Sequence, residues 1–89
     1  MSRKVLFDDH GWDDYLSWQT EERAVLKKVN RLIEDIRRNG NGEGIGKPEP
    51  LRQNLSGWWS RRITKEHRIV YHADDDTVTV IACRYHYDT

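Results

Sequence analysis

WWSRRITKEHRIVYHADDDTVTVIACRYHY, residues 58–87, contains three stretches with strand character separated by two short polar turns. The stretches are 58–64, 68–73 and 77–87, and each is rich in β-branched and aromatic residues. The tripeptides KEH and DDD between them are short enough to join antiparallel neighbours. This half of the chain therefore predicts an antiparallel meander.

The first half predicts a strand followed by two helices. Residues 4–7 are a short apolar run that we expect to join the sheet, and either Asp8 or Asp9 can cap the helix that follows. Apolar side chains then recur at helical spacing, first at Trp12, Tyr15 and Leu16, and later at Val25, Val29, Leu32, Ile33 and Ile36. Two helices before a meander predict an α+β fold, with the helices packed on one face of a small, mainly antiparallel sheet.

A glycine-rich segment, NGNGEGIGKPEP at 39–50, separates the two halves. It contains four of the six glycines and both prolines, so it cannot continue the preceding helix, and we expect a loop.

Length and composition limit the remaining choices. A chain of 89 residues predicts a single domain, 1–89, and no stretch approaches the roughly 18 apolar residues that cross a membrane. The lone cysteine, Cys83, and the absence of a secretory signal favour a cytoplasmic location. Fifteen basic and fifteen acidic residues cancel, but six bases against two acids within 47–68 predict a locally basic surface.

Strand alternation predicts which side chains share a face. If Thr64 pairs with Arg68 and Ala73 with Thr77, even-numbered residues share the open face, including Arg62, Arg68 and His86. The helices would then cover the opposite face, formed by Ile63, Ile69, Tyr71, Ile81 and Cys83. A slip of one residue in either turn would move His86 to the other face.

Several motifs together resemble one family. They are GKPEPLRQNLSGWWSRRITKEHRIVYH at 46–72, CRYHY at 83–87, W-D-D-Y-L-x-W-Q at 12–19 and K-K-V-N-x-L-I-x-D-I-R-R at 27–38. Their order and sequence resemble the YoeB-type toxins of the RelE superfamily. The resemblance implies a RelE-like fold and a ribosome-dependent endoribonuclease, or mRNA interferase, that cleaves messenger RNA in the ribosomal A site.

The resemblance also assigns roles. It places the general base on Glu49, the phosphate-binding cations on Arg52, Arg62 and Arg68, and the general acid on His86, with Tyr87 as the terminal tyrosine of the site. These residue types suit cleavage through the RNA's own 2′-hydroxyl, which needs a proton acceptor, a proton donor and positive charge near the phosphate. The four histidines and one cysteine show no zinc-site spacing, so we expect neither metal nor cofactor.

The expected partners are a YefM-like antitoxin, the 70S ribosome with its mRNA, and operator DNA only through the antitoxin. A homodimer also fits. Two other functions stay open on the same fold: a non-catalytic inhibitor of the ParE type and a corepressor of the antitoxin. We further expect Arg61 and Lys47 either to contact ribosomal RNA phosphates or to be plain surface bases.

This chain departs from the family pattern at three places. Arg52 stands where lysine is common, the glycine-rich loop is about one residue longer, and Asp88 and Thr89 follow the usual terminal tyrosine. The added carboxylate of Asp88 would lie close in sequence to His86.

Overall fold

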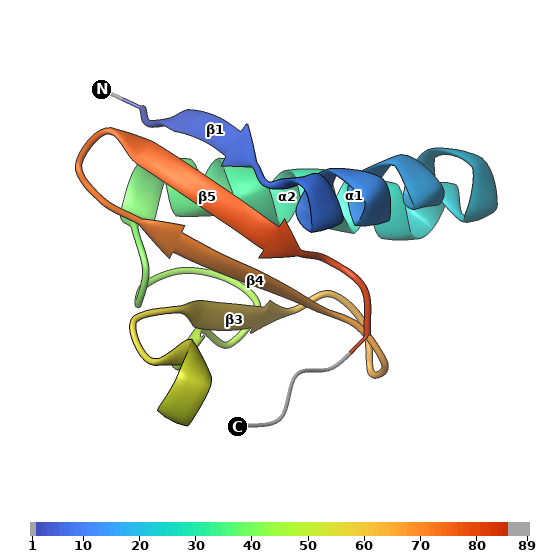
Figure 1. The fold of residues 1–89 in the computed structure, drawn as a ribbon. Helices are drawn as coiled ribbons and strands as arrows, with labels where there is room; N and C mark the ends of the chain where they lie inside the picture. Colours follow the sequence, from blue (N-terminus) through green and yellow to red (C-terminus); the bar gives the residue numbers. More distant parts are fainter. Residues whose placement is uncertain (1, 86–89) are drawn as a thin grey trace.

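The computed structural model describes residues 2–85, which form a five-stranded sheet with two helices against one of its faces (Figure 1). The elements are β1 (Lys4–Phe7), α1 (Asp9–Glu21), α2 (Arg23–Asn39), β2 (Glu49–Pro50), the 3-10 helix η1 (Gln53–Leu55), β3 (Trp59–Arg62), β4 (Arg68–Ala73) and β5 (Thr77–Ala82). The strand order is β1-β5-β4-β3-β2, with β1 parallel to β5 and the other neighbours antiparallel. The predicted α+β class, the meander and the N-terminal strand are confirmed.

Helix α1 is capped by Asp8, one of the two predicted caps, whose carboxylate accepts a hydrogen bond of 2.7 Å from the Gly11 amide. The helix lies so close to β5 that a Cβ on Gly11 would sit 2.3 Å from the Val80 carbonyl oxygen. Only glycine permits this approach, so Gly11 sets the distance between the first helix and the sheet.

Helix α2 carries the apolar stripe expected from its sequence. All five predicted positions, Val25, Val29, Leu32, Ile33 and Ile36, are buried in the core. They meet a sheet face formed by Ile63, Ile69, Tyr71, Val78, Val80 and Cys83. Burial raises the pKa of the Cys83 thiol to about 12, so this cysteine stays protonated at neutral pH.

The predicted register is wrong at both turns. Arg62, rather than Thr64, lies opposite Arg68, a shift that keeps even-numbered residues of β3 and β4 on one face. Ala73 lies opposite Val78 rather than Thr77, and this single-residue slip turns Val78 and Val80 toward the helices.

A bulge in β5 then restores the expected alternation. Tyr71 pairs with Val80 and Val70 with Ala82, which leaves Ile81 as the extra residue. Ile81 therefore leaves the core face on which we expected it and lines a cavity together with Val70 and Ala82. Ile63, Ile69, Tyr71 and Cys83 lie in the core as predicted.

The glycine-rich segment ends in a strand that the sequence did not predict. Glu49 pairs with Ser60 and Pro50 with Trp59, so β2 forms the edge of the sheet beside β3. An edge position suits Pro50, which has no amide hydrogen to donate. Within residues 2–85, no helix is long and apolar enough to span a membrane.

Candidate functional site

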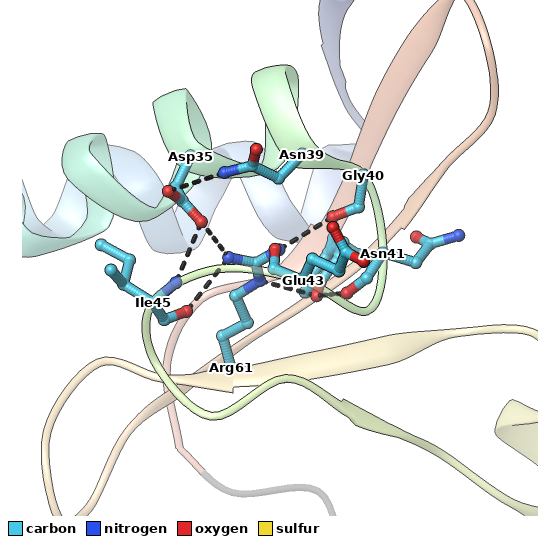
Figure 2. Close-up of polar contacts among 8 residues, drawn as sticks. Asp35, Asn39, Gly40, Asn41, Glu43, Ile45 and Arg61 are labelled. Atoms are coloured by element: carbon cyan, nitrogen blue, oxygen red, sulfur yellow. Dashed lines mark hydrogen bonds and ion pairs between the residues drawn. The ribbon is translucent and has the colours of Figure 1, made fainter.

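Arg61 fixes the glycine-rich loop from beneath (Figure 2). Its Nη1 donates to the Asp35 carboxylate and to the Ile45 carbonyl (3.0 Å), and its Nη2 donates to the carbonyls of Gly40 (2.8 Å) and Glu43 (2.7 Å). Its Nε donates to the Tyr71 hydroxyl at 2.8 Å. A guanidinium has five N–H groups, so every donor of Arg61 is used. We expected Arg61 at the surface, and this is wrong, because the residue has no exposed area.

Two further side chains complete this arrangement. Asp35 also accepts from the Ile45 amide and from the Asn39 side-chain amide, each at 3.0 Å. Asn41 binds both backbone groups of Ala73 on β4, donating to its carbonyl (3.0 Å) and accepting from its amide (2.8 Å). The loop is therefore attached to α2, β3 and β4 before it enters β2.

Glu49 lies where this fixed loop joins the sheet. Its partner Ser60 shares the open face with Arg62 and Arg68, because directly paired residues of antiparallel strands point to the same side. The Glu49 Oε2 is 3.6 Å from Nη2 of Arg68, and the carboxylate side chain is 63% exposed. The open face thus holds a solvent-accessible carboxylate beside a cation.

Arg68 is the most enclosed of the three described charged residues on that face, Glu49, Arg62 and Arg68. Its side chain is only 9% exposed, and its Nε donates to the Ser60 hydroxyl at 3.1 Å. Nη2 is buried and has no hydrogen-bond partner among residues 2–85. Buried donors are rarely left unpaired, because their lost hydration is then uncompensated. A ligand oxygen carrying negative charge would satisfy this donor.

The remaining predicted cations differ in position. Arg62 is exposed and lies directly opposite Arg68, so two guanidinium groups occupy neighbouring positions on the open face. Arg52 is exposed and precedes η1, just beyond the point where the Leu51 amide donates to the Trp58 carbonyl at 2.8 Å. The structure therefore brings Glu49, Arg62 and Arg68 together and places Arg52 at the start of the connection from β2 to β3.

His86 and Tyr87 lie outside the described residues, as do Asp88 and Thr89. The last described residue, Tyr85, accepts a hydrogen bond on its carbonyl from the Arg68 amide (2.9 Å). Ser60 was not among the predicted site residues, although strand alternation places it on the same face as Arg62. Among residues 2–85, no cluster of three or more histidine, cysteine or acidic side chains could hold a metal ion.

Known proteins resemble the chain over nearly its whole length. The family model for a YoeB-like toxin of bacterial type II toxin-antitoxin systems matches residues 7–87. Toxin YoeB of Escherichia coli K12 is 56% identical over 84 residues, which cover 94% of this chain and 99% of that protein.

Solved structures show the same similarity. The YoeB dimer from Staphylococcus aureus has a TM-score of 0.91 and 44% identity, and the match covers 98% of this chain and all of that one. The YoeB-YefM complex from the same organism has a TM-score of 0.88 and 44% identity over the same shares.

Proposed function

The chain belongs to the YoeB-like toxins of bacterial type II toxin-antitoxin systems, and from this premise we propose that it is a ribosome-dependent endoribonuclease. It cleaves messenger RNA in the ribosomal A site and so inhibits translation. The observation that carries the proposal is the buried Nη2 of Arg68, which has no hydrogen-bond partner among the described residues and lies 3.6 Å from the exposed Glu49 carboxylate.

The pairing of these two groups suits RNA chemistry. In RNA the 2′-hydroxyl and the oxygens of the adjacent phosphate are close neighbours, so a base and a phosphate-binding cation must also be close. Glu49 takes the 2′-hydroxyl proton as the 2′-oxygen forms a bond to phosphorus. The bond from phosphorus to the 5′-oxygen breaks, and His86 protonates that oxygen. The products are a 2′,3′-cyclic phosphate, which can open to a 3′-phosphate, and a 5′-hydroxyl end.

The arginines stabilise the charge that this step creates. Negative charge grows on the phosphate oxygens in the transition state, and a guanidinium already held in place stabilises it without reorganising. Arg68 is held by Ser60, while the exposed Arg62 and Arg52 bind phosphates from the solvent side. Tyr87 stacks on a nucleobase. The reaction requires no metal ion or cofactor.

Partners follow from the same premise. A YefM-like antitoxin covers the basic open face with an acidic segment and keeps the toxin inactive. The toxin reaches operator DNA only through that antitoxin, it acts in the cytoplasm where ribosomes translate, and it can form a homodimer.

Primer extension on a defined messenger RNA with purified ribosomes tests the proposal. The wild type is compared with Glu49→Ala and His86→Ala, with Glu66→Ala as a matched loss of an exposed carboxylate, and with a reaction lacking ribosomes. We expect cuts only with ribosomes, lost in the first two variants and kept in Glu66→Ala. Cleavage without ribosomes would indicate a free ribonuclease, and no cleavage in any reaction would favour a non-catalytic inhibitor of the ParE type or a corepressor.

A further inference from the structure

Each residue of the segment after β5, residues 83–85, makes hydrogen bonds to other parts of the fold. The Cys83 carbonyl accepts from the Trp18 indole (2.8 Å), and the Cys83 amide donates to Asp14 (3.0 Å). Arg84 binds both carboxylate oxygens of Glu21 at 2.8 Å and packs over the Trp18 ring. Helix α1 therefore holds the chain up to residue 84.

The backbone of Tyr85 is held by the β3–β4 turn and the first residue of β4. Its amide donates to Nδ1 of His67 at 2.8 Å, and its carbonyl accepts from the Arg68 amide at 2.9 Å. Two consecutive residues, the last of the β3–β4 turn and the first of β4, thus bind the two backbone groups of Tyr85. One of them is the arginine that carries the proposed phosphate site.

The Tyr85 backbone needs this restraint. Its φ angle of 64° lies in the left-handed region, which a residue with a large side chain rarely adopts. Such a conformation persists only where surrounding contacts impose it. Two hydrogen bonds fix this conformation: the Tyr85 amide donates to His67, and the Tyr85 carbonyl accepts from the Arg68 amide.

His67 is itself held firmly enough to impose the left-handed conformation on Tyr85. The imidazole lies between the rings of Trp18, with centroids 4.8 Å apart, and Tyr85, at 5.6 Å. The His67 backbone is fixed by its own turn, because its carbonyl accepts from the Ile63 amide (2.9 Å) and its amide donates to the Thr64 hydroxyl (3.1 Å). Nδ1 accepts a hydrogen bond only when it carries no proton, so the contact requires a neutral imidazole with its hydrogen on Nε2.

We propose that His67 is a positioning residue of the nuclease: by accepting the Tyr85 amide on Nδ1, it fixes the point beside Arg68 from which the chain continues to the proposed general acid, His86. This rests on the proposed function, because it gives His67 a part in the same site. His67 does not transfer a proton itself, since its acceptor nitrogen is occupied by the backbone.

Three substitutions at one position separate positioning from simple packing. His67→Asn places an amide oxygen near the position of Nδ1, His67→Gln carries its oxygen one bond further out, and His67→Leu keeps the bulk without any acceptor. We expect His67→Leu and His67→Gln to lower kcat for ribosome-dependent cleavage roughly 10- to 100-fold, the scale for displaced catalytic groups, with little change in KM. His67→Asn should recover most of the loss.

Amide hydrogen exchange at Tyr85, followed by NMR, gives a readout without catalysis. The Tyr85 amide should be protected in the wild type and in His67→Asn and should exchange freely in His67→Leu. Equal kcat in all four proteins, or a Tyr85 amide that exchanges freely in the wild type, would overturn the proposal. A protected Tyr85 in a wild type without any cleavage would instead contradict the proposed function, and the positioning role would fall with it.

Discussion

Arg61 and Arg68 lie on opposite faces of the same two paired strands, and they differ in how many of their side-chain N–H donors are hydrogen-bonded. Arg61 faces the helices with all five donors bonded to the loop, to Asp35 and to Tyr71. Arg68 faces the open side, and among residues 2–85 its side chain has one hydrogen bond, to Ser60, and a more distant ion pair with Glu49. A buried arginine with satisfied donors builds structure, whereas one with an unused donor keeps binding capacity for a ligand.

The largest effect expected from this difference is on stability. Arg61→Met should lower the free energy of unfolding by about 3–5 kcal/mol, because it leaves Asp35 and three loop carbonyls without their shared donor. Urea unfolding followed by tryptophan fluorescence measures this. Arg62→Met, at the neighbouring exposed position, is the matched control and should change stability by less than about 0.5 kcal/mol. Equal losses in both variants would remove the distinction between the two faces.

A matched pair of hydroxyl deletions sharpens the comparison. Tyr71 and Ser60 each accept from the Nε of one arginine, Arg61 and Arg68 respectively. Tyr71→Phe should cost about 1–3 kcal/mol, because the hydroxyl also donates to the Asn41 carbonyl and its loss leaves two partners unpaired. Ser60→Ala should cost about 0.5–1.5 kcal/mol, because it removes the one hydrogen bond from Arg68 Nε. The same unfolding measurement decides, and a larger cost for Ser60→Ala would contradict the assignment of the structural role to Arg61 and its partners.

Alkaline pH should lower the free energy of unfolding gradually and by a smaller amount, through Tyr71 on the helix-facing side of the sheet. Burial raises the pKa of Tyr71, and the hydrogen bond from Arg61 offsets only part of this. As the pH rises past 10, the unfolded chain loses the phenol proton before the native protein does, so the free energy of unfolding falls. Tyr71→Phe should remove this part of the fall, whereas the part from Cys83, whose pKa is about 12, should remain. If the free energy of unfolding fell equally with pH in the wild type and in Tyr71→Phe, this prediction would be contradicted.

The sequence predicted the elements better than their connections. The stripe from Val25 to Ile36 could be predicted because helical periodicity repeats over many residues. The family motifs pointed to Glu49 and Arg68, which the structure places 3.6 Å apart, while their roles stay a prediction. The register could not, because it depends on turn geometry and on the bulge at Ile81, which leave no periodic signal. Strand β2 was hidden by its two-residue length and its proline.

The doublet Arg61–Arg62 illustrates the limit most clearly. Adjacent basic residues look like a solvated surface, yet alternation along β3 must place them on opposite faces. The signal for a buried Arg61 was therefore present. What the sequence could not show was that loop carbonyls, rather than water or RNA, would satisfy its donors.

The ribosome-dependent cleavage rate of Arg68→Ala, measured by primer extension on a fully folded sample, tests the central claim most directly. We expect a loss of roughly 10²- to 10³-fold, the scale for removing one preorganised transition-state contact, while the unfolding midpoint changes less than in Arg61→Met. A cleavage rate equal to that of the wild type would show that Nη2 of Arg68 has no part in the reaction.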